Sequence, residues 1–219
     1  MEERFPNRRE AGRRLAERLR AYRGREDAIV LGLPRGGVPV GYEVARELGL
    51  PLDVFIVRKL GVPGYEELAI GAVASGNVSV LNEDVMRALP NAEAILEAVL
   101  AREKIELEQK EARYRQDRPV QDLRGRVVIL VDDGLATGAT MRAAAAALRK
   151  KDVARIVVAV PVGAPETCQA LEAEVDELIC VSQPEFFHGV GQFYGDFSQT
   201  TDEEVRELLR LTSDQERLD

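Results

Sequence analysis

The sequence is poor in the residues and segments that mark several classes of protein. Its two cysteines, Cys168 and Cys180, match no zinc-ligand spacing, and no second pair is present to build a disulfide framework. We therefore expect both thiols to be reduced and structural. No apolar run is long enough to cross a bilayer, and the residues after Met1 lack the apolar core of a secretory signal. The sequence thus predicts a cytoplasmic protein with no membrane partner.

Positive charge is also scarce. The 219 residues carry 30 basic and 38 acidic side chains, a net charge of −8, and only five of the basic residues are lysines. A dedicated nucleic-acid binder needs a basic footprint, so we predict that nucleic acid is not a partner, although one basic cleft is compatible with this composition. With 45% hydrophobic residues, the chain can build one substantial core. We predict a single domain over residues 1–219.

The most informative stretch is an apolar run followed by two carboxylates and a small polar loop. Val127–Val131 is an unbroken aliphatic run, typical of a central strand buried on both faces of a parallel sheet. It ends at Asp132 and Asp133. The loop that follows consists of Ala136, Thr137, Gly138, Ala139 and Thr140, and helix-forming sequence begins at its end. In an open α/β sheet, ligands bind at such a strand-to-helix junction.

The chemistry of this junction fits a sugar phosphate. Free N–H groups and the positive dipole of a helix N-terminus favour an anion at residues 136–140. Asp132 and Asp133 can accept hydrogen bonds from vicinal sugar hydroxyls, or hold a hydrated Mg²⁺ ion that a polyphosphate brings in. A phosphate on one side and hydroxyls on the other describe a ribose 5-phosphate.

Three other interpretations explain less of this stretch. Receiver domains also place two acidic residues after a strand, but early in the chain, whereas this pair lies past the midpoint. A Walker A loop needs a lysine before its Ser or Thr, and Gly138-Ala139-Thr140 has none. An ordinary strand-to-helix turn accounts for the glycine and threonine residues, but not for two adjacent aspartates at the end of a buried strand.

Residues 128–140 resemble the phosphoribosyl-pyrophosphate (PRPP) signature of the type I phosphoribosyltransferases, which is an aliphatic strand, two acidic residues and a Thr-Gly-x-Thr loop. The resemblance implies that Asp132 and Asp133 bind the ribose hydroxyls, and that main-chain amides of residues 136–140 bind the 5′-phosphate. Strands and helices alternate along the chain, which independently predicts an α/β fold: an open, mostly parallel twisted sheet with helices on both faces. We expect the core over about residues 25–181. A small C-terminal hood would follow at about residues 182–219, with the N-terminal helix as a candidate addition.

Two further stretches follow the predicted strands at residues 28–33 and 52–57. Pro34-Arg35-Gly36-Gly37 precedes a predicted helix at residues 40–48 and is a second candidate anion site, because glycine allows close approach and Arg35 adds charge. Arg58 and Lys59 should lie at the same rim of the sheet. The resemblance implies that the pyrophosphate is bound by Arg35, Gly36, Gly37, Arg58 and Lys59. It also implies a catalytic group of Asp132, Asp133, Arg58 and Lys59.

The other segments give less specific signals. The predicted helix at residues 8–22 is amphipathic, and its basic residues are expected on a solvated face. Residues 60–67 have the composition of a mobile loop, which in the family closes over the active site, and residues 69–74 and 78–81 predict a hairpin. Residues 91–116 predict a helix of unusual length. Its far half could project, cover the site or meet another subunit.

Residues 183–199 contain four of the six phenylalanines and the only histidine. Such aromatic residues can form a stacking pocket for a nucleobase, or an apolar cluster that closes the end of the sheet. The family has a C-terminal hood that holds the acceptor base, which implies that Phe186, Phe187, Val190 and Tyr194 bind the base. His188 is expected to be incidental.

The implied reaction is displacement of pyrophosphate from C1 of PRPP by a ring nitrogen of a small-molecule base. Its Mg²⁺ would be chelated mainly by the substrate and secondarily by Asp132 and Asp133. We also expect a homo-oligomer, specifically a dimer. Ala136 departs from the 6-oxopurine enzymes, which carry an acidic residue there, so the acceptor base stays open. Two alternatives also stay open: a PRPP-sensing regulatory protein without turnover, and a non-catalytic nucleotide-binding α/β protein.

Overall fold

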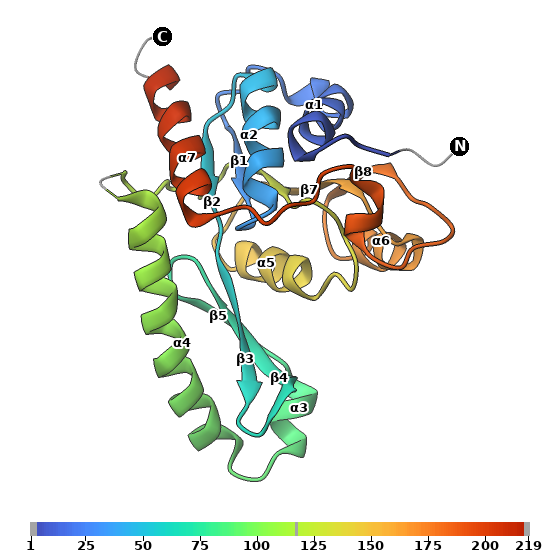
Figure 1. Cartoon of the computed structure of the whole chain (residues 1–219). Coiled ribbons are helices and arrows are strands. Elements are labelled where there is room, and N and C mark those ends of the chain that lie inside the picture. Colours follow the sequence, from blue (N-terminus) through green and yellow to red (C-terminus); the bar gives the residue numbers. More distant parts are fainter. Residues whose placement is uncertain (1–3, 117, 217–219) are drawn as a thin grey trace.

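The computed structural model describes residues 4–116 and 118–216, and its centre is a five-stranded sheet (Figure 1). The strand order is β2 (Leu52–Val54), β1 (Ala28–Gly32), β6 (Val127–Val131), β7 (Arg155–Val162) and β8 (Glu177–Ser182). Every neighbouring pair is parallel. The predicted parallel sheet is therefore confirmed, and the carboxyl ends of β1 and β6 lie side by side, with Gly32 opposite Val131.

Helices cover both faces of this sheet (Figure 1). One face packs against α1 (Arg8–Arg18), α2 (Gly37–Leu48) and α7 (Asp202–Glu216), and the other against α5 (Ala139–Arg149) and α6 (Pro165–Glu172). Alternate residues of a strand point to opposite faces, so Ile129 packs with the first group and Leu130 with the second. Burial on both faces explains why β6 is aliphatic throughout.

A second, antiparallel sheet follows β2 and corrects two predictions. The strand expected over residues 52–57 divides after Val54, because β3 (Val57–Val62) pairs with β4 (Tyr65–Ala74) instead of extending the main sheet. Residues 60–67, expected as a mobile loop, form the tip of this hairpin, with Gly64 at a φ of 83° in its turn. The predicted pairing of residues 69–74 with β5 (Val78–Leu81) is confirmed.

The long predicted helix is α4 (Ala92–Arg115), which follows the short α3 (Glu83–Ala88). It runs along the second sheet toward α7 (Figure 1) and contacts β3, β4 and α7. Its buried residues include Val99, Glu103, Leu107 and Tyr114. The far half of α4 therefore packs on the rest of the molecule instead of projecting from it.

The C-terminal segment returns to the N-terminal one. Residues 183–200 include a 3₁₀ turn at Val190–Phe193, and Phe5 forms a parallel bridge with Tyr194. A small apolar core joins the two segments and consists of Phe5, Ala11, Val162, Phe193 and Tyr194. Among the described helices, none has both the length and the apolar character needed to cross a bilayer.

Candidate active site

Asp132 and Asp133 lie where β6 ends, and both are largely withdrawn from solvent. The Asp133 side chain is 15% exposed. Asp132 Oδ1 accepts a 2.8 Å hydrogen bond from the backbone N–H of Asp133. Burial raises the pKa of both carboxyls, and the charge of Asp133 raises that of Asp132 further. Two close carboxylates at a partly buried strand end therefore favour a ligand that brings hydrogen-bond donors or positive charge.

Arg8 belongs to this site, although its helix was expected to carry only a solvated basic face. Its Nε donates to Asp133 Oδ2 at 2.8 Å, and its Nη1 donates to the Ser198 carbonyl oxygen at 2.7 Å. The guanidinium lies 4.0 Å from the centroid of the Phe197 ring. Only 12% of the Arg8 side chain is exposed. The position is therefore an internal one, and nothing in the local sequence distinguishes Arg8 from the other arginines of α1.

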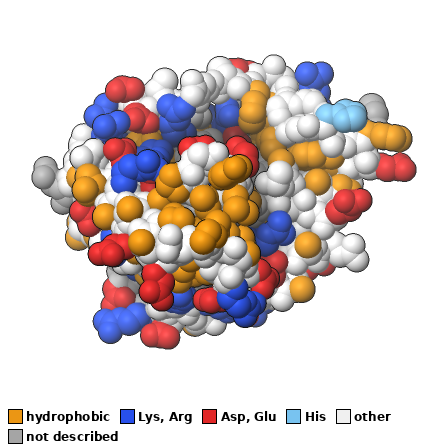
Figure 2. Space-filling view, turned by 90° about the horizontal axis from the view of Figure 1, so that it is seen from below, with side chains coloured by type: hydrophobic (Ala, Val, Ile, Leu, Met, Phe, Trp, Pro, Cys, Tyr) orange, Lys and Arg blue, Asp and Glu red, His pale blue; other side chains and the backbone are white. Residues whose placement is uncertain are grey.

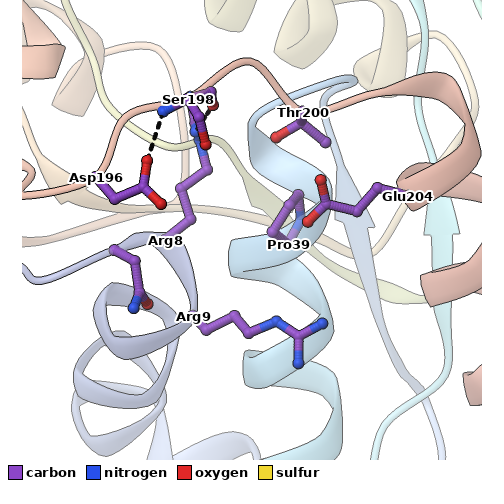
Figure 3. A pocket seen from close by; sticks show the side chains of 8 residues that line it. Arg8, Arg9, Pro39, Asp196, Ser198, Thr200 and Glu204 are labelled. Atoms are coloured by element: carbon purple, nitrogen blue, oxygen red, sulfur yellow. Dashed lines mark hydrogen bonds between the residues drawn. The ribbon is translucent and has the colours of Figure 1, made fainter.

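A polar cavity of about 230 Å³ opens beside Arg8 (Figure 3). It is lined by residues of α1, α2, α7 and the segment before α7: Asn7, Arg8, Arg9, Pro39, Asp196, Ser198, Thr200 and Glu204. In Figure 3 the side chain of Arg8 extends from α1 toward Ser198. Because Arg8 both lines the cavity and pairs with Asp133, it is the link between the cavity and the acidic pair.

Residues 136–140 lead from the acidic pair into α5. Among the described residues, none accepts a hydrogen bond from their backbone N–H groups. The carbonyls of Ala136 and Thr137 do have partners, since they accept bonds from Thr167 Oγ1 at 2.6 Å and Arg142 Nη2 at 2.8 Å. Gly138 is at a φ of 72°, where a side chain is disfavoured. The loop thus has the free amides that the predicted 5′-phosphate site requires.

The loop at residues 34–37 lies directly against the acidic pair. A Cβ at Gly36 would overlap Asp133 Oδ2, and one at Gly37 would lie 2.5 Å from the Val131 carbonyl oxygen. Gly36 has an ordinary φ of −63°, so close approach and not backbone angle requires a glycine there. α2 begins at Gly37, three residues before the start predicted at residue 40. The N-terminal end of α2 therefore faces the same point as residues 132 and 133.

Arg58 and Lys59, predicted to act together, point in different directions. They are adjacent in β3, and successive strand residues point to opposite faces. Arg58 faces α4, where its Nε and Nη2 lie 2.8 Å and 2.7 Å from Glu103 Oε2. Lys59 instead lines a largely apolar cavity of about 230 Å³ with Ala139 and Thr140. Lys59 therefore lies beside the predicted 5′-phosphate loop, and Arg58 does not share that cavity.

Arg35 is held by a carboxylate that no local pattern placed near this loop. Its Nη1 lies 4.0 Å from Oδ1 of Asp202, the first residue of α7. The same carboxylate accepts a 2.7 Å hydrogen bond from the Tyr114 hydroxyl and pairs with Arg113 Nη1 at 3.2 Å. The hydrogen bond from the Tyr114 hydroxyl has the larger effect, and together with the Arg113 contact it holds the pKa of Asp202 below its ordinary value. Asp202 is therefore an anion that joins the 34–37 loop to α4.

Two of the four residues predicted to bind the base are an exposed phenylalanine and one that stacks within the aromatic segment. Phe186 is 67% exposed. Phe187 stacks on Phe193, with ring centroids 5.5 Å apart. His188, which was expected to be incidental, is exposed, and it is the pale blue side chain at the surface in Figure 2. The aromatic segment thus makes an apolar cluster in addition to any contact with a ligand.

The other two residues, Val190 and Tyr194, lie against the chain at the end of β6. Tyr194 is buried, and its hydroxyl donates to the Asp133 carbonyl oxygen at 2.6 Å. Val190 lies against Gly134, since a Cβ at that glycine would be 2.5 Å from Val190 Cγ1. Tyr194 therefore supports the backbone of the acidic pair, and Val190 packs against the glycine that follows it.

The acidic pair alone is a poor resident metal site. Within the described residues, no three metal-binding side chains gather at one place. Mg²⁺ prefers octahedral oxygen coordination and commonly binds through one or two carboxylates together with substrate phosphates and water. Asp132 and Asp133 therefore fit a Mg²⁺ ion that arrives with a polyphosphate.

Comparison with known proteins adds independent findings. Residues 3–198 match the family described as "Phosphoribosyl transferase domain". MT0597 of Mycobacterium tuberculosis (strain CDC 1551 / Oshkosh), which bears a provisional phosphoribosyl transferase name, is 46% identical over 205 residues. That match covers 94% of this chain and 46% of the relative, so the chain spans about half its length. The crystal structure of TT1426 from Thermus thermophilus is similar with a TM-score of 0.84 and 47% identity, covering 94% of this chain and 97% of that one.

Proposed function

Because the chain belongs to the phosphoribosyl transferase family, we propose that it transfers ribose 5-phosphate from PRPP to a nitrogenous base, with release of pyrophosphate and dependence on Mg²⁺. One observation carries the proposal. The acidic pair lies between two glycine-containing loops, residues 34–37 and 136–140, and each loop leads into a helix N-terminus. Two anion sites on either side of hydroxyl-binding carboxylates match the two ends of PRPP.

The mechanism follows from these positions. The free amides of residues 136–140 hold the 5′-phosphate, and Asp132 and Asp133 accept hydrogen bonds from the ribose hydroxyls. The pyrophosphate then lies near the 34–37 loop and Arg35. As the bond from C1 to pyrophosphate breaks, positive charge develops on the sugar next to the two carboxylates, and negative charge develops on the leaving group next to Arg35. Bound Mg²⁺ would neutralise part of the pyrophosphate charge. Catalysis is thus chiefly positioning and charge stabilisation.

The direct test is PRPP-dependent release of pyrophosphate with a panel of purine and pyrimidine bases, with and without Mg²⁺. We expect release with at least one base, matched by one nucleotide formed per pyrophosphate, and loss of release when Mg²⁺ is chelated. PRPP binding without release for any base would contradict the enzyme proposal and favour a PRPP-sensing regulator.

Gly36→Ala should lower this turnover by at least about tenfold, because a shift of the reacting groups by even 1 Å is costly to catalysis. The new Cβ would overlap the Asp133 carboxylate and disturb its ion pair with Arg8. Steady-state rates of pyrophosphate release measure the effect. Gly189→Ala is the matched control, since nothing lies within 4 Å of its Cβ position and its backbone is extended. Equal rates for the two variants would show that the 34–37 loop need not lie against Asp133.

A further inference from the structure

Lys110 of α4 lies beside Tyr114, and the Tyr114 hydroxyl donates to Asp202, the carboxylate that pairs with Arg35 of the predicted pyrophosphate loop. Lys110 is half-buried and lies on the helix face that also carries Glu103, Leu107 and Tyr114, at helical spacings of three and four residues. The other three residues of this face are buried, and the helix packs on β3 and α7. The Lys110 side chain is therefore directed inward and not to the solvent face of α4.

Lys110 has no acidic partner in the described part of the chain. No carboxylate there lies within 4.0 Å of its Nζ, which lies 5.8 Å from the centroid of the Tyr114 ring. The groups that act on it electrostatically are Asp202 and three arginines: Arg35, Arg58 and Arg113. Burial lowers the pKa of Lys110, and the three arginines lower it further, against the opposite effect of Asp202. The ammonium group therefore lies in a region where positive charge is in excess.

The same cations come from three different elements. Arg35 belongs to the 34–37 loop, Arg58 to β3, and Lys110 and Arg113 to α4. Among the described residues, two carboxylates form ion pairs with these four cations: Glu103, which holds Arg58, and Asp202, which holds Arg113 and, more distantly, Arg35. Four cations against two carboxylates leave two positive charges in excess, and a small polyanion would balance them.

We propose that α4 supplies half of the pyrophosphate site: Lys110 and Arg113 bind the pyrophosphate group together with Arg35 and Arg58. Before the substrate binds, the Asp202 carboxylate pairs with Arg35 and Arg113, and the pyrophosphate group then displaces it. The inference rests on the proposed function, because it takes the Arg35 loop as the pyrophosphate site. It gives a role to the long helix, since α4 carries its two cations to a loop more than 70 positions away in sequence. A group with several charged oxygens can engage several of these donors at once.

The test is a calorimetric titration of the full-length protein with pyrophosphate in the presence of Mg²⁺. Lys110→Met should weaken pyrophosphate binding by about tenfold, and Lys110→Arg should restore most of the affinity. Lys104→Met is the matched control, because it makes the same change at another partly exposed position of α4, and Lys104 is not one of the four cations of the proposed site. Asp202→Asn should change affinity in the opposite direction and tighten binding, because it releases Arg35 and Arg113.

Two further readouts separate a binding role from a structural one. The affinity of Lys110→Met should fall less steeply with added salt than that of the wild type, because one charge contact is gone. Ribose 5-phosphate should bind both proteins equally, since it uses residues 136–140. Equal pyrophosphate affinities for the wild type and Lys110→Met would overturn the inference, as would equal loss of affinity for both ligands. Failure of the proposed function would show itself separately, as absence of base-dependent pyrophosphate release.

Discussion

Asp132→Asn should reduce the rate of base-dependent pyrophosphate release by roughly 10²–10³-fold, the effect expected when one preorganised electrostatic contact to a transition state is lost. The amide keeps the shape of the side chain. Its oxygen can still accept the 2.8 Å hydrogen bond from the backbone N–H of Asp133. The loss would therefore come from the missing negative charge beside the developing positive charge of the sugar. Steady-state kinetics with saturating base and varied PRPP measure it.

The same variant should be at least as stable as the wild type. Burial and the Asp133 charge raise the pKa of Asp132 well above its ordinary value, so the folded state binds this proton more tightly than the unfolded state. The stability from that preference is fully present below the ordinary pKa and is lost as pH rises through the raised folded-state pKa. Wherever the carboxylate is ionised it therefore destabilises the fold, and a neutral amide removes this effect.

Thermal unfolding measured across a range of pH tests the direction of this change in stability. The melting temperature of Asp132→Asn should be equal to or above that of the wild type at pH 7, and the difference should shrink as pH falls below the raised pKa. An inactive variant with a lower melting temperature at pH 7 would mean that Asp132 holds the fold together and need not touch the substrate.

The parts of the site that the sequence predicted are those encoded locally. The aliphatic run of β6, the two aspartates and the small loop before α5 occupy one continuous stretch, so a strand, its end and a helix start could be read in order. Gly36 and Gly37 were predicted to allow close approach. In the structure, a Cβ at Gly36 would meet the Asp133 carboxylate, and one at Gly37 would meet the backbone at Val131. Local pattern is sufficient where one segment contains both the element and its functional residues.

The residues that local pattern could not supply depend on distant contacts. Arg8 meets Asp133 across 125 positions in sequence, and on its own helix it is one of several arginines. Lys110 likewise lies among charged residues, and only the packing of α4 on β3 shows which face is internal. A helical pattern predicts that one face is buried, but not what that face meets.

The β3–β4 hairpin shows how composition can mislead. Glycine and proline at residues 60–67 indicate a loop, yet the segment forms a paired ribbon with irregular register at Gly61. A Cβ at Gly61 would lie 2.9 Å from the Glu66 carbonyl oxygen, so this glycine permits close approach of the partner strand. Single-residue irregularities in a ladder leave no periodic signal, which is why the strand was missed.

Arg115 anchors the C-terminal end of α4 to β2. Arg115→Met should lower the free energy of unfolding by about 3–5 kcal/mol, because it leaves a buried carboxylate without its partner. Arg115 Nε lies 3.2 Å from both carboxylate oxygens of Asp53, and Nη2 donates to the Val54 carbonyl oxygen at 3.0 Å. For a chain of this size the melting temperature should fall by roughly 6–20 °C, as measured by calorimetry or circular dichroism. Arg102→Met, on the same helix with 68% of its side chain exposed, should change stability by less than about 1 kcal/mol.

A second substitution separates charge from packing. Burial raises the pKa of Asp53 even beside Arg115, so its protonated form is favoured by the fold, and stability from that preference is lost as pH rises through the folded-state pKa. In Arg115→Met this pKa should rise further, and the variant should lose more stability than the wild type between acidic and neutral pH. Asp53→Asn added to Arg115→Met should then recover much of the loss, because a neutral amide replaces the unpaired charge. A double variant no more stable than Arg115→Met would instead place the anchoring effect in the hydrogen bond to Val54 and the packing of the Arg115 side chain on β2.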